Sequence, residues 1–287
     1  MSYDRIVPRI RATIWPLIVT AAVCLALGVP SAGAADAAET LALRYAPVIR
    51  LVKQTEPCGH GEPYRPTDAN VVLGNAEVAL RGPWDATNVV SVAPAAADLS
   101  AGLHGYHLDF PGNAVEPACD YEEWSQRATE HSPPTMYARV VGDPAYPNQI
   151  ALQYWFFYLF NDFNDKHEGD WEMIQLDFDA STAQTALAQK PALIGYSQHE
   201  GAEEAHWGDS KLELVDGTHP VVYPAAGSHA NYYDSALYLG RSAAQGVGCD
   251  DTVGPSRDVR PVVAVIPHRD RCVPEQIPVA RVRRPLG

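Results

Sequence analysis

The run IALQYWFFYLF at residues 150–160 limits the fold more than any other part of this chain. It is apolar on both faces, and a strand of that kind lies in the interior of a sheet rather than at its edge. The stretch WEMIQLDFD at residues 171–179 alternates apolar and polar side chains, as a half-buried strand does. The sequence therefore predicts a central strand followed by a second, half-buried one.

Further strands are predicted where apolar or alternating runs are bounded by turn residues, at residues 45–52, 70–80, 135–142, 191–199, 211–225 and 259–267. An Asp216-Gly217 step inside one of these runs indicates a hairpin. Short helices are expected at residues 181–190 and in parts of 95–103. Strands without regularly alternating helices predict an all-β fold, a β-sandwich of mostly antiparallel strands with long loops and a few short helices.

The first 34 residues have the layout of a secretory signal peptide, with three arginines, an apolar core and a small-residue stretch that ends at Ala34. The alternatives are a retained membrane anchor and a lipid anchor on Cys24. The apolar core is shorter than the ~20 residues of a full span. The sequence thus predicts a secreted protein, with a signal peptide at residues 1–34, a single domain at residues 35–287 and no transmembrane span in the mature chain.

The mature chain is strongly acidic. The full sequence has a formal charge of −14, and residues 1–34 hold one acidic and three basic residues, so the remainder has a formal charge of −16. Such a surface repels phosphate backbones, and no basic cluster interrupted by aromatic residues is present, so nucleic acid is not an expected partner. The balance is compatible with cation binding.

Four cysteines remain once Cys24 is removed with the leader, an even number in a chain bound for an oxidising compartment. Three pairings are possible, and we favour the two that join sequence neighbours, Cys58 with Cys119 and Cys249 with Cys272. Free buried thiols are the alternative. The spacing gives no CxxC zinc signature.

The stretch NDFNDKHEGDWEMIQLDFD, residues 161–179, places acidic residues at the end of a strand. Alternation puts Asp170 and Glu172 on the same face as the apolar residues that follow, and His167 comes from the adjoining loop. Two close carboxylates repel one another unless a cation or a shared proton lies between them. Asp162 or Asp165 would complete a set of metal ligands.

One imidazole with two or three carboxylates suits Mg²⁺, Mn²⁺ or Ca²⁺, whereas Zn²⁺ usually takes more nitrogen or sulfur. The alternative is a solvated acidic turn with Trp171 packed on the opposite face. The stretch is not HExxH, because Trp171 stands four positions after His167, so the zinc-protease motif is absent.

Two further strand ends are polar and contain histidine. GYSQHEG places His199 in phase with Ser197, and YPAAGSHANYY places Ser228, His229 and Asn231 just after another strand. Each histidine alone is more often a hydrogen-bonded loop residue, but three such strand ends favour a shared cleft. A hydrolytic triad with Ser228 or Ser197 as nucleophile is the alternative, although no G-x-S-x-G elbow is present.

Four motifs resemble the Vps62-related (DUF946-like) family, in the expected order from about Tyr45 to Tyr233. They are YAPVIRL with EPYRPTDANVVLGN, LQYWFFYLFND with HEGDWE, YSQHEG, and HPVVYPAAGSHANYY. The name of that family records a link to vacuolar sorting and establishes no biochemistry.

A more distant resemblance is to necrosis-inducing NPP1-like (Nep1-like) proteins, carried by YWFFYLFND, HEGDWE and SQHEG. It implies a β-sandwich with a divalent cation in a cleft and a sphingolipid sugar headgroup as ligand. By position it implies metal ligands at Asp162, His167, Asp170 and Glu172, and a cleft histidine at His199. Glu168 and Gly169 depart from that family's Arg-His pair.

Together these features predict a divalent-metal-binding β-sandwich that binds a hydroxyl-rich ligand, a glycan or glycolipid headgroup. They are compatible with peripheral membrane contact, although no amphipathic stretch indicates it. The ion is Mg²⁺, Ca²⁺ or Mn²⁺, and the ligand is contacted by His199 and by Ser228, His229 and Asn231. The alternative is a metal-dependent hydrolase with His199 or Glu168 as general base. A third interpretation is a structural protein whose ion only holds the loop.

Overall fold

The computed structural model describes residues 32–83, 88–100, 104–242, 246–267 and 282–283. Most of the regular structure in these residues is strand, and the helices are few and short. The prediction of an all-β protein with mostly antiparallel strands is confirmed. Two strand pairs, β1 with β11 and β5 with β16, are parallel.

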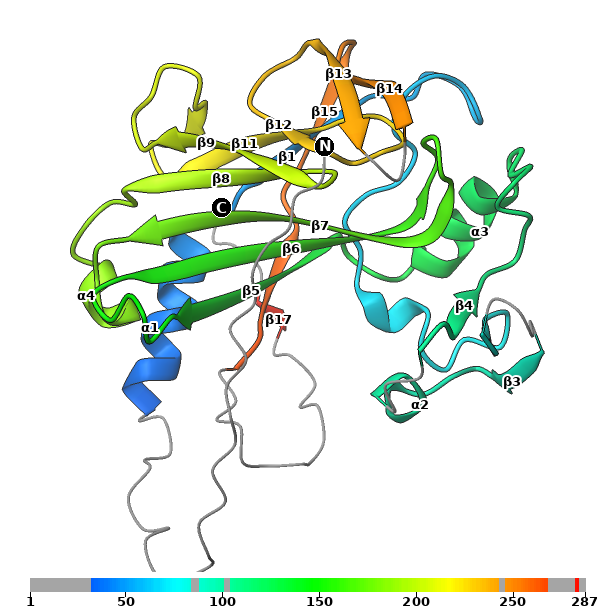
Figure 1. Ribbon diagram of the computed structural model, residues 1–287, viewed down its shortest axis with the longest axis horizontal. Coiled ribbons are helices and arrows are strands. Elements are labelled where there is room, and N and C mark those ends of the chain that lie inside the picture. The colour runs from blue at the N-terminus through cyan, green and yellow to red at the C-terminus, as the bar shows by residue number, and fades with distance from the viewer. Residues whose placement is uncertain (1–31, 84–87, 101–103, 243–245, 268–281, 284–287) are drawn as a thin grey trace, which may run out of the picture.

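The larger sheet has seven strands in the order β17-β16-β5-β6-β7-β8-β9 (Figure 1). Its strands are β5 (Thr135–Gly142), β6 (Ile150–Asn161), β7 (His167–Phe178), β8 (Leu193–Gln198), β9 (Gly201–His206), β16 (Val262–Val265) and β17 (Val282–Arg283). The apolar run of residues 150–160 forms β6, which lies in the middle of this order, as its two apolar faces predict. Every residue of β6 from Phe156 to Asn161 is buried.

The second sheet has the order β10-β11-β1-β15, with β12 paired to β11. Its strands are β1 (Val48–Val52), β10 (Leu214–Val215), β11 (His219–Pro224), β12 (Asn231–Tyr232) and β15 (Ser256–Val259). Buried residues of this sheet, among them Ile49, Leu51 and Val222, pack with residues of β5 to β8 in one core. The two sheets therefore form the sandwich. The predicted hairpin is present, because β10 pairs with β11 around Asp216 and Gly217, both at positive φ.

Two smaller sheets lie outside the sandwich. One contains β2 (Ala79–Arg81), β3 (Val89–Val92) and β4 (His107–Asp109), and the other is a hairpin of β13 (Leu237–Ser242) and β14 (Gly246–Asp251) (Figure 1). The strand predicted at residues 70–80 is wrong over most of its length, because a 3-10 helix at Ala69–Val71 and turns precede β2. Asp68 caps that helix by accepting a hydrogen bond from the backbone N–H of Asn70.

The helices are α1 (Ala32–Arg44), α2 (Ala96–Ser100), α3 (Asp120–Thr129) and α4 (Ala183–Ala186). The sequence predicts α2 and α4 but not α1 or α3. Helix α1 buries Leu41 and Ala42 in the main core and lies beside α4. Helix α3 begins directly after Cys119 and packs near β6. No helix in the described ranges is long and apolar enough to cross a membrane.

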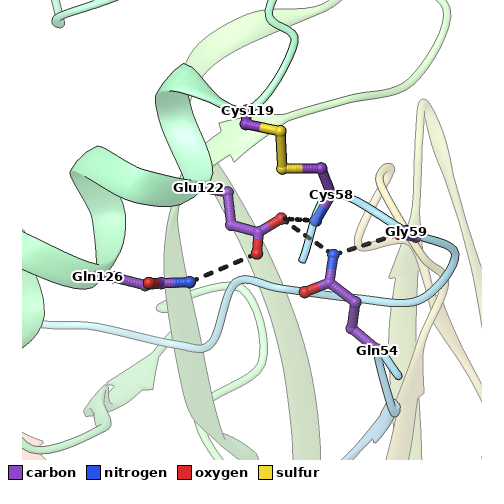
Figure 2. The surroundings of a disulfide bond; sticks show 6 residues. All are labelled: Gln54, Cys58, Gly59, Cys119, Glu122 and Gln126. Atoms are coloured by element: carbon purple, nitrogen blue, oxygen red, sulfur yellow. Dashed lines mark hydrogen bonds between the residues drawn. A yellow bond between two sulfur atoms is a disulfide. The ribbon is translucent and has the colours of Figure 1, made fainter. Parts of the chain in front are cut away.

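The predicted disulfide between Cys58 and Cys119 is present and joins the segment after β1 to the start of α3. Figure 2 shows the buried carboxylate of Glu122 beside it. This carboxylate accepts hydrogen bonds from the backbone N–H of Cys58 (2.9 Å) and from Gln54 (3.0 Å). The predicted partner of Cys249, Cys272, lies outside the described residues, and Cys249 is exposed.

Candidate functional site

The β6–β7 pair positions the predicted acidic residues. In its antiparallel register Phe156 lies opposite Glu172 and Tyr158 lies opposite Asp170. Burial alternates along β7, so Asp170 and Glu172 share the buried face with the apolar residues that follow them, as predicted. His167 differs from the prediction, because it is the first residue of β7 and not part of the loop.

His229 is held between two carboxylates in the interior. Its Nδ1 lies 2.8 Å from Oδ2 of Asp170, and its Nε2 lies 3.4 Å from Oε1 of Glu62. The imidazole stacks on the ring of Tyr158, with centroids 3.8 Å apart and planes 4° from parallel. Burial alone would lower the pKa of His229, but the charge of Glu62 and the hydrogen bond to Asp170 raise it. His229 is therefore a buried cation that neutralises part of this acidic cluster.

Asp170 and Glu172 differ in how their charges are compensated. Burial favours the neutral form of Asp170, but the hydrogen bond and charge of His229 bring its pKa below the usual range. Asn161 also donates to Oδ2 of Asp170 at 3.0 Å. Glu172 accepts a hydrogen bond from the hydroxyl of Ser197, yet burial and then the charge of Asp170 raise its pKa to about 8. Negative charge on Glu172 is thus only partly compensated.

The loop of residues 225–230 is fixed against the end of β6. Gly227 donates its backbone N–H to Glu62 at 2.8 Å and accepts from the backbone N–H of Asp162 at 3.0 Å. A Cβ at position 227 would lie 2.8 Å from the carbonyl oxygen of Asp162, and the residue has φ +83. Only glycine adopts this positive φ readily and leaves room for the carbonyl oxygen of Asp162 without a shift of the backbone. This close approach places His229 over Tyr158.

The predicted metal ligands are only partly brought together. Asp162 is exposed, and its carboxylate lies 3.5 Å from Nζ of Lys166. Nε2 of His167 lies 4.0 Å from Oδ1 of Asp170. No three His, Cys, Asp or Glu side chains in the described part of the chain have the arrangement of metal ligands. The metal site stays a prediction.

A second buried carboxylate, that of Asp250, contacts two of the other predicted site residues, His199 and Ser228. Its oxygens lie 2.7 Å from Nε2 of His199 and accept hydrogen bonds from Ser228 (2.5 Å) and Tyr232 (2.7 Å). The strand ends at His199 and Ser228 therefore meet, as the sequence suggests.

Burial at this carboxylate bears on the predicted ligand contacts. Ser228, His229 and Asn231 are 2%, 0% and 0% exposed. A side chain with almost no accessible surface cannot touch a dissolved ligand, so this closed arrangement does not favour a direct contact by these three. His199 keeps a small exposed fraction, 7% of its side chain.

The geometry of a serine triad is absent from the described residues. Ser228 donates to Asp250 and Ser197 donates to Glu172, and neither hydroxyl has a hydrogen bond to a histidine. A serine nucleophile needs a base within hydrogen-bond reach of its hydroxyl. Each serine instead stabilises a buried carboxylate.

Glu168, the alternative general base, is fully engaged in holding the fold. One of its oxygens accepts from the hydroxyl of Tyr121 at 2.5 Å and the other accepts from the backbone N–H of Phe110 at 3.0 Å. Burial raises its pKa to about 6, although both hydrogen bonds oppose that rise. The carboxylate thereby joins helix α3 and the segment after β4 to the start of β7.

Sequence reasoning missed three residues of this cluster: Glu62, Asn161 and Asp250. Glu62 stands in the motif EPYRPTD, which gives no indication that its side chain reaches a histidine 167 positions later. Asp250 follows Cys249 in the strand β14, where alternation places it inward and Cys249 outward.

The raised pKa of Glu172 predicts a pH-dependent effect of Glu172→Gln. Between about pH 4.5 and pH 8 the folded chain holds a proton that the unfolded chain releases, so this group lowers stability as the pH rises through that window. In metal-free buffer, the unfolding free energy of Glu172→Gln minus that of the natural chain is expected to grow by about 1–3 kcal/mol from pH 5 to pH 8. Urea unfolding at both pH values measures it, and a constant difference would contradict it.

No family model and no curated protein matches the chain. Among solved structures, NLPPya in complex with glucosamine is 17% identical with a TM-score of 0.37, over 80% of this chain and 74% of that one. The non-toxic HaNLP3 protein is 10% identical with a TM-score of 0.38, over 79% and 74%. Necrosis and Ethylene inducing Protein 2 from the causal agent of cocoa's Witches Broom disease has a TM-score of 0.30 at 16% identity, over 54% and 57%.

The compared structures belong to the group named by the more distant sequence resemblance. At these identities and TM-scores the similarity carries no argument about what this chain does. Membership in the Vps62-related family stays a prediction, because no family model matches.

Proposed function

We propose that this chain is an exported binding protein that holds a divalent cation at the start of β7 and uses it to bind a hydroxyl-rich ligand. His167, Asp170 and Glu172 are the protein ligands, and water or the bound molecule fills the other positions. Mg²⁺, Ca²⁺ or Mn²⁺ fits this donor set, which is rich in oxygen and poor in nitrogen.

The orientation of His167 carries the proposal. Its Nδ1 lies 3.1 Å from the carbonyl oxygen of Gly169 and donates to it, so Nε2 is the ring nitrogen that can bind an ion. A hydrogen bond from the other ring nitrogen to a backbone carbonyl fixes the orientation of metal-binding histidines in this way. Nε2 faces Oδ1 of Asp170 at 4.0 Å, a separation that suits two atoms each bound at about 2.0–2.6 Å to one ion.

The charge balance of the cluster also supports a cation. Glu62, Asp170, Glu172 and Asp250 are buried carboxylates, and His229 is the fully buried histidine among them. Burial and then the charge of Asp170 raise the pKa of Glu172, and a bound cation would oppose both effects. The side chain of Asn231 donates a hydrogen bond from Nδ2 to the hydroxyl of Ser197. Its Oδ1 is buried and accepts no hydrogen bond from the described residues. Oxygen atoms in such surroundings favour hard cations.

The ligand class follows from the few protein donors. Three side chains leave several positions of a six- to eight-coordinate ion open, and paired hydroxyls of a sugar are suitable oxygen ligands. His167 has 39% of its side chain exposed, so the site opens to solvent on this side. The disulfide between Cys58 and Cys119 supports an oxidising, extracellular location.

Calorimetric titration of Ca²⁺, Mg²⁺ and Mn²⁺ into chelator-treated, dialysed protein tests the cation site. We expect saturable binding near one ion per chain, weakened at least about tenfold in His167→Ala and Glu172→Gln. Asp162→Asn is the matched control, because Asp162 pairs with Lys166, and it should bind normally. Absence of binding by all three ions would refute the site. Loss only in Asp162→Asn would move it to the loop before β7.

The ligand part is tested separately by titrating glucosamine and a neutral disaccharide with and without the bound ion. Glucosamine is a fitting first probe because one of the compared proteins was solved with it. Binding that requires the ion and disappears in His167→Ala supports the proposal. Equal binding in chelator would show that the ion has no part in ligand recognition.

A further inference from the structure

A cavity of about 380 Å³ lies beside the segment after β1 and shares Glu62 with the acidic cluster described above. Gln54 and Arg65 from this segment, Ser125 and Gln126 from α3, and Arg257 from β15 line it. Its volume lies in the range of small-molecule sites, about 300–1,000 Å³. Two arginines, Arg65 and Arg257, and two carboxylates, Glu62 and Glu130, share this lining.

Both arginines are anchored by neutral backbone groups. Nη2 of Arg65 donates to the carbonyl oxygens of Thr129 (3.3 Å) and Ser132 (3.0 Å). Nη2 of Arg257 donates to the carbonyl oxygens of Glu62 (3.2 Å) and Tyr64 (3.4 Å). Each guanidinium has five N–H donors, and within the described residues the hydrogen bonds of both come from Nη2 alone. These anchors fix the two side chains before any ligand arrives.

Neither arginine has a carboxylate within 4.0 Å in the described ranges. By contrast, Arg50 pairs with Asp258 at 2.7 Å and with Glu213 at 2.9 Å on the same sheet. Burial, opposed by the charge of Glu62, lowers the pKa of Arg257, and the charge of Arg65 lowers it further. Glu62, which also lines the cavity, uses its carboxylate oxygens to accept hydrogen bonds from the backbone N–H groups of Tyr64 and Gly227. The two guanidinium groups are thus free to bind an oxyanion.

We propose that this cavity binds a small ligand through one oxyanion group, a carboxylate or a phosphate, held by the guanidinium groups of Arg65 and Arg257. Planar guanidinium groups contact such oxyanions through paired N–H donors. The cavity size and the acidic surface of the chain favour a small molecule over a polyanion such as nucleic acid. Ser125 and Gln126 offer polar groups for the rest of the ligand.

The test is titration of inorganic phosphate and of succinate, separately, into metal-free dialysed protein at constant ionic strength. We expect saturable binding of at least one of them, weakened about tenfold or more in Arg65→Gln and in Arg257→Gln. Arg127→Gln is the matched control, because Arg127 is an exposed arginine on α3 that pairs with Glu77 at 3.6 Å. It should bind like the natural chain. Whichever of the two compounds binds, phosphate or succinate, identifies the oxyanion group as a phosphate or a carboxylate.

Glu130→Gln keeps the test decisive if the arginine variants do not fold. Glu130 also lines the cavity and is exposed, so its replacement removes a negative charge from the wall without disturbing the core. Oxyanion binding should tighten several-fold in this variant. No saturable binding of either anion, or equal binding in all variants, would overturn the proposal. Because no divalent metal is present, this result is independent of the cation site.

Discussion

Replacing His229 with glutamine is expected to destabilise the protein by about 3–5 kcal/mol at pH 7, because it leaves the buried carboxylates of Glu62 and Asp170 without their shared cation. Stability from a histidine with a raised pKa is complete below its ordinary pKa of 6.5 and disappears only as the pH rises through the raised value. Since pH 7 lies only slightly above 6.5 and far below the raised pKa of about 10, most of the loss is expected there. Urea unfolding of the natural and variant chains measures it.

His131→Gln is the control for this experiment. His131 is exposed, 3.9 Å from an exposed carboxylate of Glu130, and its replacement should change stability by less than about 0.5 kcal/mol. The stability difference between His229→Gln and the natural chain should become smaller near pH 4, because the unpaired carboxylates of Glu62 and Asp170 take up protons there. A change below 1 kcal/mol at pH 7 would mean that the buried ion pairs contribute nothing net.

Removing the disulfide with Cys58→Ala/Cys119→Ala is expected to cost about 4 kcal/mol of unfolding free energy. The bond spans 61 positions of sequence, and closing a loop of that length restricts the unfolded chain by about this amount. Local packing should change little, because Glu122 still accepts hydrogen bonds from Cys58 N–H and Gln54. Thermal and urea unfolding of the oxidised chain and the variant give the difference.

Cys249→Ala serves as the comparison, since Cys249 is exposed and has no disulfide to a described residue. Reduction of the natural chain by dithiothreitol should reproduce the loss seen in the double variant. If reduction leaves the unfolding midpoint unchanged, the bond contributes no stability and the buried hydrogen bonds around Glu122 hold this region by themselves.

The strands of the sandwich are predictable because their signal is local. Alternation along β7 requires only that one face is buried, and the apolar run of β6 requires only that both are. The hairpin at Asp216-Gly217 is encoded in two residues. Failure at residues 70–80 has a local cause as well, because Asp68 caps a helical turn where apolar residues suggest a strand.

The electrostatics of the site are not predictable in this way. Whether Asp170 is a free carboxylate or a member of an ion pair depends on His229, 59 positions later in the sequence. It also depends on Glu62, which lies at the other ring nitrogen of His229. Sequence spacing identifies the polar strand ends and indicates that they meet. It does not show that Asp250 satisfies both His199 and Ser228, or that His229 is removed from solvent altogether.

Helix α1 has a consequence for maturation of the chain. Its core contacts come from Ala37, Leu41 and Ala42, and the carbonyl oxygen of Ala42 accepts a hydrogen bond of 2.7 Å from the hydroxyl of Tyr154. All of these residues follow Ala34, the predicted end of the leader. A protease that cuts there would remove none of these contacts. If the leader ends at Ala34, cleavage shortens α1 by its first three residues and leaves its packed part, from Ala37 onward, in place.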